Sequence, residues 1–81
     1  MAKSEIRSHL PGTFYRRPAP DRPPYREPGD KVAKGDVIGL VEVMKSFHEI
    51  TATADGVITA FLIENEEPLM AGQVVAEIED A

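Results

Sequence analysis

The sequence predicts a small all-β fold, a flattened and pseudo-symmetric β-sandwich or barrel. Three observations support this fold class. An internal repeat relates the two halves of the chain, turn signals recur at short intervals, and no window shows hydrophobic periodicity of helical type over a useful length. Two similar halves in a chain this short are typical of two β-units that face each other across one core.

The repeat is clearest between residues 31–43, KVAKGDVIGLVEV, and residues 68–80, PLMAGQVVAEIED, at an offset of 37 residues. It places Gly35 on Gly72, which we expect to occupy tight turns with positive φ because only glycine reaches that conformation without steric cost. Turn signals also occur at 28–30, 34–36, 54–56, 65–67 and 71–72. Strands of about five residues fit between them, about six to eight in all.

The first half contains an insertion. PGTFYR at 11–16 resembles DGVITA at 55–60, but the offset there is 44, so the first half has about seven additional residues upstream of the turn at 34–36. The segment RPAPDRPP, residues 17–24, contains four prolines. Because proline lacks the N–H that a sheet requires and has a fixed φ, we expect this segment to leave the sheet as a stiff loop.

The repeat also predicts which side chains face the core. Glu77 and Glu79 are expected to point to water, so alternate residues of that strand point inward. Glu42 is expected to point outward by correspondence. The predicted inward residues are Val74, Ala76 and Ile78, with Val37, Gly39 and Val41 in the first half.

Composition limits the function classes. The 81 residues form one small domain that buries only about 60% of its unfolded surface, so a broad enzymatic cleft is not expected. The net charge of −5 disfavours nucleic acid or an anionic membrane as partner. Without cysteine the chain has no disulfide and no thiolate nucleophile. The N-terminal residues do not resemble a signal peptide, and we expect a cytoplasmic domain trimmed to its fold.

The segment VEVMKSFHEI, residues 41–50, contains an unusual turn. Strands at 37–43 and 47–53 flank a reversal centred on Met44-Lys45, which has no Gly, Asn, Asp or Pro. An exposed lysine in a turn more often serves only solubility. A methionine beside it, however, gains nothing from burial at an exposed tip, and such a local inconsistency indicates function. Asn65-Glu66 is predicted to be the counterpart of this turn in the second half, where no lysine occurs.

Several segments resemble biotinyl domains. EVMKSF, residues 42–47, resembles their Glu-Ala-Met-Lys-Met signature, with Val43 in place of Ala and Ser46 in place of the second Met. Residues 11–24 are similar to the Gly-Thr-Phe-Tyr-Arg segment and proline-rich thumb of the biotin carboxyl carrier subunit of bacterial acetyl-CoA carboxylase. Residues 29–42 and 54–79 match the remainder of that family in order.

The resemblance implies one biotinyl domain over residues 1–81, with two four-stranded antiparallel sheets in a barrel-sandwich hybrid and a thumb insertion at 17–24. It implies biotin as a covalent cofactor on Lys45. The residues that it places around the cofactor are Met44, Glu42, Val43 and Ser46 near the attachment point and Arg17, Pro18, Ala19, Pro20, Asp21, Arg22, Pro23 and Pro24 in the thumb.

The resemblance also implies three partner proteins. A biotin protein ligase would acylate the lysine amine, and it must offset the cost of deprotonating the ammonium, because only the neutral amine is a nucleophile. Biotin carboxylase would then load the cofactor, and a carboxyltransferase would unload it onto acetyl-CoA. Tethering replaces diffusion by a high effective concentration, and the chain itself would be a non-catalytic carrier.

Three alternatives remain open. The carrier could serve another carboxylase that acts on a different acyl-CoA, a keto acid or an amide-type substrate. It could be a lipoyl domain, although lipoyl domains usually have Asp where Met44 stands before the lysine. It could also be an unmodified β interaction module.

Other polar residues have weaker functional signals. His9 and His48 lack metal-ligand spacing, and no metal is expected. Four arginines near the thumb either bind a carboxyl or carbonyl group or only make the loop soluble. Acidic residues near the tip and at the C-terminus either steer the docking of a partner or form a solvated face. These residues are Arg16, Arg17, Arg22 and Arg26, and Glu42, Glu49, Glu77, Glu79 and Asp80.

Overall fold

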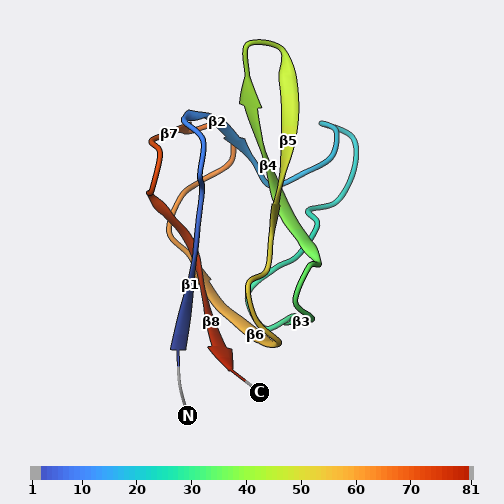
Figure 1. The fold of residues 1–81 in the computed structure, drawn as a ribbon. Coiled ribbons are helices and arrows are strands. Elements are labelled where there is room, and N and C mark those ends of the chain that lie inside the picture. Colours follow the sequence, from blue (N-terminus) through green and yellow to red (C-terminus); the bar gives the residue numbers. More distant parts are fainter. Residues whose placement is uncertain (1–2, 81) are drawn as a thin grey trace.

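The computed structural model describes residues 3–80, which form two four-stranded antiparallel sheets (Figure 1). The strands are β1 Lys3–Arg7, β2 Gly12–Tyr15, β3 Lys31–Val32, β4 Val37–Val43, β5 Ser46–Thr51, β6 Gly56–Phe61, β7 Pro68–Leu69 and β8 Val74–Asp80. Their orders are β1-β8-β6-β3 and β5-β4-β2-β7. The predicted all-β fold with two sheets is confirmed, as a sandwich and not as a closed barrel. Residues 3–80 contain no helix that could cross a membrane.

The pseudo-symmetry is visible in the strand order. If β1 to β4 are exchanged with β5 to β8, the order of one sheet becomes that of the other. Gly35 and Gly72 have φ of 94° and 83°, as predicted. Their N–H groups make equivalent hydrogen bonds, from Gly35 to the Ala52 carbonyl and from Gly72 to the Ser8 carbonyl. The sequence repeat therefore corresponds to a structural repeat.

The predicted counterpart of the Met44-Lys45 turn is wrong. Glu66 (φ 67°) is equivalent to Gly29 (φ 97°), because each donates its N–H to the neighbouring strand of its own sheet, Glu66 to the Phe14 carbonyl at 2.6 Å and Gly29 to the Ile58 carbonyl at 2.7 Å. The β4–β5 hairpin is instead equivalent to the paired strands β8 and β1, which hold the two ends of the chain (Figure 1). The turn signals alone could not assign the counterpart, because the equivalence of two turns depends on which strands they join.

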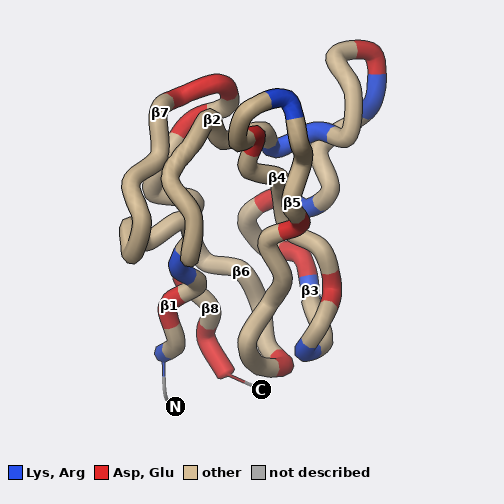
Figure 2. Tube along the Cα trace, turned by 45° about the horizontal axis from the view of Figure 1, so that its top comes forward, with Lys and Arg blue, Asp and Glu red and all other residues tan. Residues whose placement is uncertain are grey.

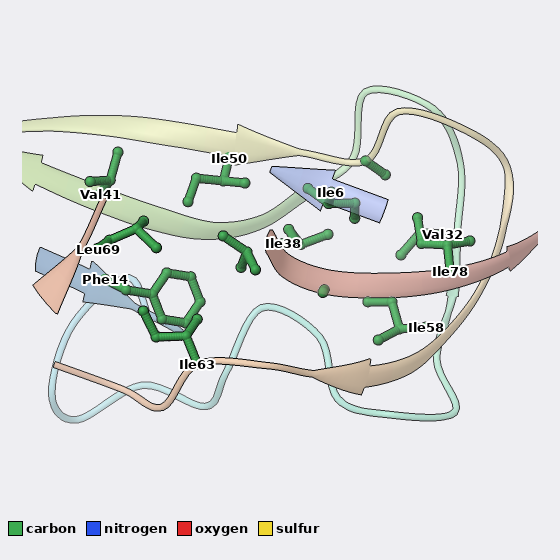
Figure 3. Packing of buried hydrophobic residues seen from close by; sticks show 13 residues of the cluster. Ile6, Phe14, Val32, Ile38, Val41, Ile50, Ile58, Ile63, Leu69 and Ile78 are labelled. Carbon is green, nitrogen blue, oxygen red and sulfur yellow. The ribbon is translucent and has the colours of Figure 1, made fainter. Parts of the chain in front are cut away.

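Buried aliphatic side chains and Phe14 form one core between the sheets (Figure 3). Ala76, Ile78, Gly39 and Val41 are buried as predicted.

The predicted inward direction of Val37 and Val74 is wrong, because both are only half-buried. Their neighbours Ile38 and Val75 are fully buried instead. The pairing of β4 with β5 passes from Val37 directly to Gly39, and that of β8 with β1 passes over Val75 in the same way. A β-bulge inserts one unpaired residue and shifts the alternation of side chains, which a simple two-residue period does not anticipate.

The proline-rich segment 17–24 lies outside the strands and projects from the sandwich on the side of β4 (Figure 1). Its base is closed by a hydrogen bond from Tyr25 N–H to the Arg16 carbonyl at 2.9 Å. A second bond, from Arg22 N–H to the Ala19 carbonyl at 3.1 Å, tightens the loop itself. This segment is called the thumb below.

Candidate functional site

The β4–β5 hairpin extends beyond the rest of the sandwich and ends in the Met44-Lys45 turn (Figure 1). Both turn residues have positive φ, 49° and 68°, and the Met44 side chain is 93% exposed. Lys45 is exposed as well, and the predicted exposed reversal is confirmed. A two-residue turn of this type favours Asn and Gly, and a side chain with a β-carbon destabilises the left-handed conformation by about 1–2 kcal/mol. The turn sequence is therefore not the one that would stabilise the hairpin best.

The predicted neighbours of Lys45 divide between the two faces of the hairpin. Glu42 pairs with Phe47, and Val43 pairs with Ser46. Because successive residues of a strand point to opposite faces, Glu42 and Val43 face opposite ways. Glu42 faces the thumb, whereas Val43 packs against the edge of the core.

A recess of about 360 Å³ lies between the hairpin, the thumb and the loop that follows β6. It is called the thumb recess here, and its lining residues are Tyr15, Arg17, Pro18, Ala19, Pro20, Glu42, Phe47, Asn65 and Glu66. Rings and proline surfaces provide apolar walls, and two carboxylates provide hydrogen-bond acceptors. This combination suits a small ligand with an apolar body and N–H donors.

Tyr15 holds the recess together at the hairpin. Its hydroxyl donates to the Glu42 carboxylate at 3.1 Å, and its ring lies 5.9 Å from the Phe47 ring in a tilted arrangement. The hydrogen bond to Glu42 raises the pKa of Tyr15, and desolvation and the negative charges of Glu42 and Glu66 raise it further. Tyr15 therefore stays a neutral donor and fixes the Glu42 side chain.

The thumb residues predicted from the sequence fall into two groups. Arg17, Pro18, Ala19 and Pro20 line the recess, whereas the second half of the thumb does not. The residues that do not line it are Asp21, Arg22, Pro23 and Pro24.

Two of the four arginines near the thumb have structural contacts. Arg16 lies 4.4 Å above the Phe61 ring, and its guanidinium donates to the Arg26 carbonyl. Arg26 in turn pairs with Asp36 at 3.5 Å. Arg17 alone among the four lines the recess, where its guanidinium donates to the Arg22 carbonyl at 3.1 Å. Of the predicted arginine cluster, Arg17 therefore contributes a positive charge to the recess, and Arg16 and Arg26 make contacts elsewhere.

Sequence reasoning missed four recess residues. Sequence patterns indicated no functional role for Tyr15 and Phe47, and they predicted Asn65-Glu66 only as the counterpart of the Met44-Lys45 turn. Phe47 lies in the recess because it pairs with Glu42 across the hairpin. A single sequence does not reveal this pairing register, so Phe47 could not be predicted from it.

The opposite face of the hairpin borders a second groove of about 470 Å³, and both histidines, His9 and His48, are among its lining residues. Among residues 3–80 no group of three or more His, Asp or Glu side chains is arranged to hold a metal ion. The acidic residues of β8 lie near the chain ends, away from the hairpin tip (Figure 1). Figure 2 shows basic residues at that tip and on the thumb, with acidic residues close to both.

The model of one protein family, described as biotin-requiring enzyme, matches residues 4–78. The chain belongs to this family. It is 40% identical over 73 residues to the biotin carboxyl carrier protein of acetyl-CoA carboxylase from Streptococcus pyogenes serotype M6, with 90% of this chain and 44% of the relative aligned. It is 42% identical over 64 residues to the biotin carboxyl carrier protein of acetyl-CoA carboxylase 2, chloroplastic, from Arabidopsis thaliana, with 79% of this chain and 25% of the relative aligned. The chain spans less than half the length of these relatives.

Solved structures agree on the fold. Urea carboxylase from Kluyveromyces lactis superposes with a TM-score of 0.80 at 28% identity, covering 98% of this chain and 6% of that protein. A single-chain, multi-domain long-chain acyl-CoA carboxylase superposes with a TM-score of 0.81 at 16% identity, covering 98% and 7%. The second similarity concerns the fold alone.

Proposed function

We propose that this chain is a biotin carboxyl carrier domain, residues 1–81, that bears biotin on Lys45. The observation that carries the proposal is the Met44-Lys45 turn, in which a lysine occupies the exposed tip of a projecting hairpin at the position of the family signature. An amide would form between the lysine Nζ and the cofactor's carboxyl carbon, with AMP leaving from the adenylate that a biotin protein ligase supplies. Bound biotin supplies the ureido nitrogen that accepts and releases a carboxyl group.

The residues of the thumb recess fit this cofactor. Biotin has an apolar bicyclic body and a ureido group with two N–H donors. Pro18 and Phe47 provide apolar surface, and the Glu42 and Glu66 carboxylates can accept those donors. The lipoyl group carries a dithiolane without N–H donors, so the same lining favours biotin over lipoate.

The partners follow from the carrier role. We propose that the chain passes a carboxyl group from a biotin carboxylase to a carboxyltransferase in a complex of the acetyl-CoA carboxylase type, as a subunit without catalytic residues of its own. The names of the relatives from Streptococcus pyogenes and Arabidopsis thaliana support this assignment. A cytoplasmic location and the lack of nucleic-acid or membrane partners remain predictions.

A second candidate keeps the carrier and changes the acceptor. The structural similarity to urea carboxylase, at 28% identity, favours a carboxylase with an amide-type substrate. Reconstitution with the cognate carboxyltransferase, followed by parallel product assays with acetyl-CoA and with urea, separates the two candidates.

The modification site is tested by intact mass after co-expression with an active biotin ligase. We expect one biotinyl increment, its complete loss in Lys45→Arg, and no loss in Lys34→Arg, because Lys34 lies in an exposed turn of another loop. A chain that stays unmodified would favour an interaction module. A lipoyl increment, or biotin on another lysine, would equally contradict the proposal.

A further inference from the structure

We propose that the thumb recess holds the biotin ring in its uncharged state and rejects the ring once it carries a carboxylate. The recess would then act as a charge-sensitive latch that keeps the unloaded arm close to the domain and frees the loaded arm for its next partner. This inference rests on the proposed function and adds to it a difference between the two states of the cofactor.

Both carboxylates of the recess are carried on well-anchored backbone. Glu42 lies on β4 and receives the hydrogen bond from Tyr15. Glu66 lies in the loop between β6 and β7, where its N–H donates to the Phe14 carbonyl at 2.6 Å and the neighbouring Asn65 accepts from the Arg16 N–H at 2.9 Å. An anion in the recess would therefore be repelled by two carboxylates, and the segments that carry them are held in place by hydrogen bonds.

The remaining charges compensate only in part. Among the described residues that line the recess, Arg17 is the one basic side chain, so one of the two carboxylate charges is left unbalanced. Attachment of biotin converts the Lys45 ammonium into a neutral amide, which removes a positive charge from the hairpin tip. The modified domain thus has two carboxylates and one guanidinium around the recess.

The Tyr15 hydroxyl lies beside the same two carboxylates. The hydrogen bond to Glu42 raises the pKa of Tyr15 most, and desolvation and the negative charges of Glu42 and Glu66 raise it further. A carboxylate on the cofactor would face the same two side chains. The uncharged ring does not experience this repulsion, and it retains the apolar contacts with Phe47 and the thumb prolines.

Docking of the ring is measured by NMR of the isotope-labelled 81-residue chain, after intact mass has shown complete biotinylation. The reporters are the ring signals of Tyr15 and Phe47, recorded for the unmodified, biotinylated and carboxylated forms, the last prepared with biotin carboxylase, ATP and bicarbonate. We expect biotinylation to shift both signals and carboxylation to lower the ratio of docked to free ring about five-fold or more. Because the recess is open to solvent, raising the salt from about 0.05 M to about 0.5 M should reduce this difference.

Glu66→Gln is the decisive variant, because it removes one recess carboxylate and leaves the Tyr15–Glu42 hydrogen bond intact. In this variant we expect carboxylation to lower the ratio of docked to free ring by only about two-fold or less. Glu64→Gln is the matched control: it makes the same charge change in the same loop, but Glu64 lines a different groove with Arg16 and Phe61, so the five-fold fall should remain.

The outcomes distinguish the two proposals. Absence of a biotinyl mass increment contradicts the proposed function and removes the basis of the latch with it. A complete increment with no shift of the Tyr15 and Phe47 signals overturns the latch and leaves the carrier function standing. The latch is also overturned if carboxylation leaves the docked population unchanged, or if Glu64→Gln reduces the fall as strongly as Glu66→Gln.

Discussion

The β4–β5 hairpin and the β8–β1 pair are equivalent parts of the molecule, and they differ in how they end. In both, two antiparallel strands run side by side with a bulge at the corresponding position. In β4–β5 a two-residue turn closes the pair and carries Lys45 into solvent, whereas the pair β8–β1 holds the two ends of the chain (Figure 1). The scaffold is thus nearly symmetric, and the proposed attachment site lies on a connection between two strands that the β8–β1 pair lacks.

The surroundings of the two strand pairs differ as well. Beside the hairpin, the thumb that follows β2 forms a recess together with the Tyr15–Glu42 pair. In the other half, β6 is the strand equivalent to β2, and it is followed by a short loop without such an insertion. The prolines of the thumb have a fixed φ, so this loop loses less conformational entropy on ordering than a flexible loop of the same length would. An insertion in one copy of a repeat therefore gives that copy a recess that the other copy lacks, without altering the shared core.

The largest effect is expected at the two bulges, where the halves should behave alike. Ile38→Ala should lower the free energy of unfolding by about 2–5 kcal/mol, and Val75→Ala by about 1.5–3 kcal/mol, because both side chains are fully buried. Thr59, which the pairing of β6 with β8 also skips, is exposed, and Thr59→Ala should cost less than about 1 kcal/mol.

Urea denaturation measures all three variants. An unchanged midpoint for Ile38→Ala, together with a large loss for Val75→Ala, would show that the bulges are not equivalent in the two sheets.

A smaller effect, of opposite sign, is expected at the hairpin turn. Met44→Asn should raise the free energy of unfolding by about 0.5–1 kcal/mol, because Asn adopts the left-handed conformation of this position (φ 49°) more readily than Met. Thermal unfolding measures the gain, and intact mass shows whether the ligase still modifies Lys45. A loss of stability would mean that Met44 makes contacts that its 93% exposure does not indicate.

The smallest effect concerns the Tyr15 hydroxyl at alkaline pH. Since the folded state raises its pKa above the ordinary value of 10.0, the folded chain holds this proton more tightly than the unfolded chain. The resulting stabilisation is present below pH 10.0 and is lost as the pH rises through the higher, folded pKa.

Phenolate absorbance during a pH titration measures this ionisation. The titration curve of Tyr15→Phe, which retains only Tyr25, is subtracted to isolate the signal of Tyr15. Glu42→Ala should move the Tyr15 midpoint to lower pH because it removes the hydrogen-bond acceptor that is the main cause of the shift. A midpoint that does not move would show that the hydrogen bond to Glu42 is not maintained in solution.

The sequence by itself determined the local features of this protein. The repeat predicted two similar halves, the four prolines predicted a loop outside the sheets, Gly35 and Gly72 predicted turns with positive φ, and Met44-Lys45 predicted an exposed reversal. Each of these follows from the conformational preference of a few neighbouring residues, or from comparison of the chain with itself.

Only the tertiary structure decided the remainder. The bulges that turn Ile38 and Val75 inward, the true counterpart of the hairpin, and the meeting of Tyr15 with Glu42 and Glu66 all depend on strand pairings between distant residues. A shift of one residue in such a pairing changes every contact while leaving local preferences almost unchanged, because backbone hydrogen bonds do not distinguish one register from the next. Burial of a shared core selects the register, and the core exists only once both halves have come together.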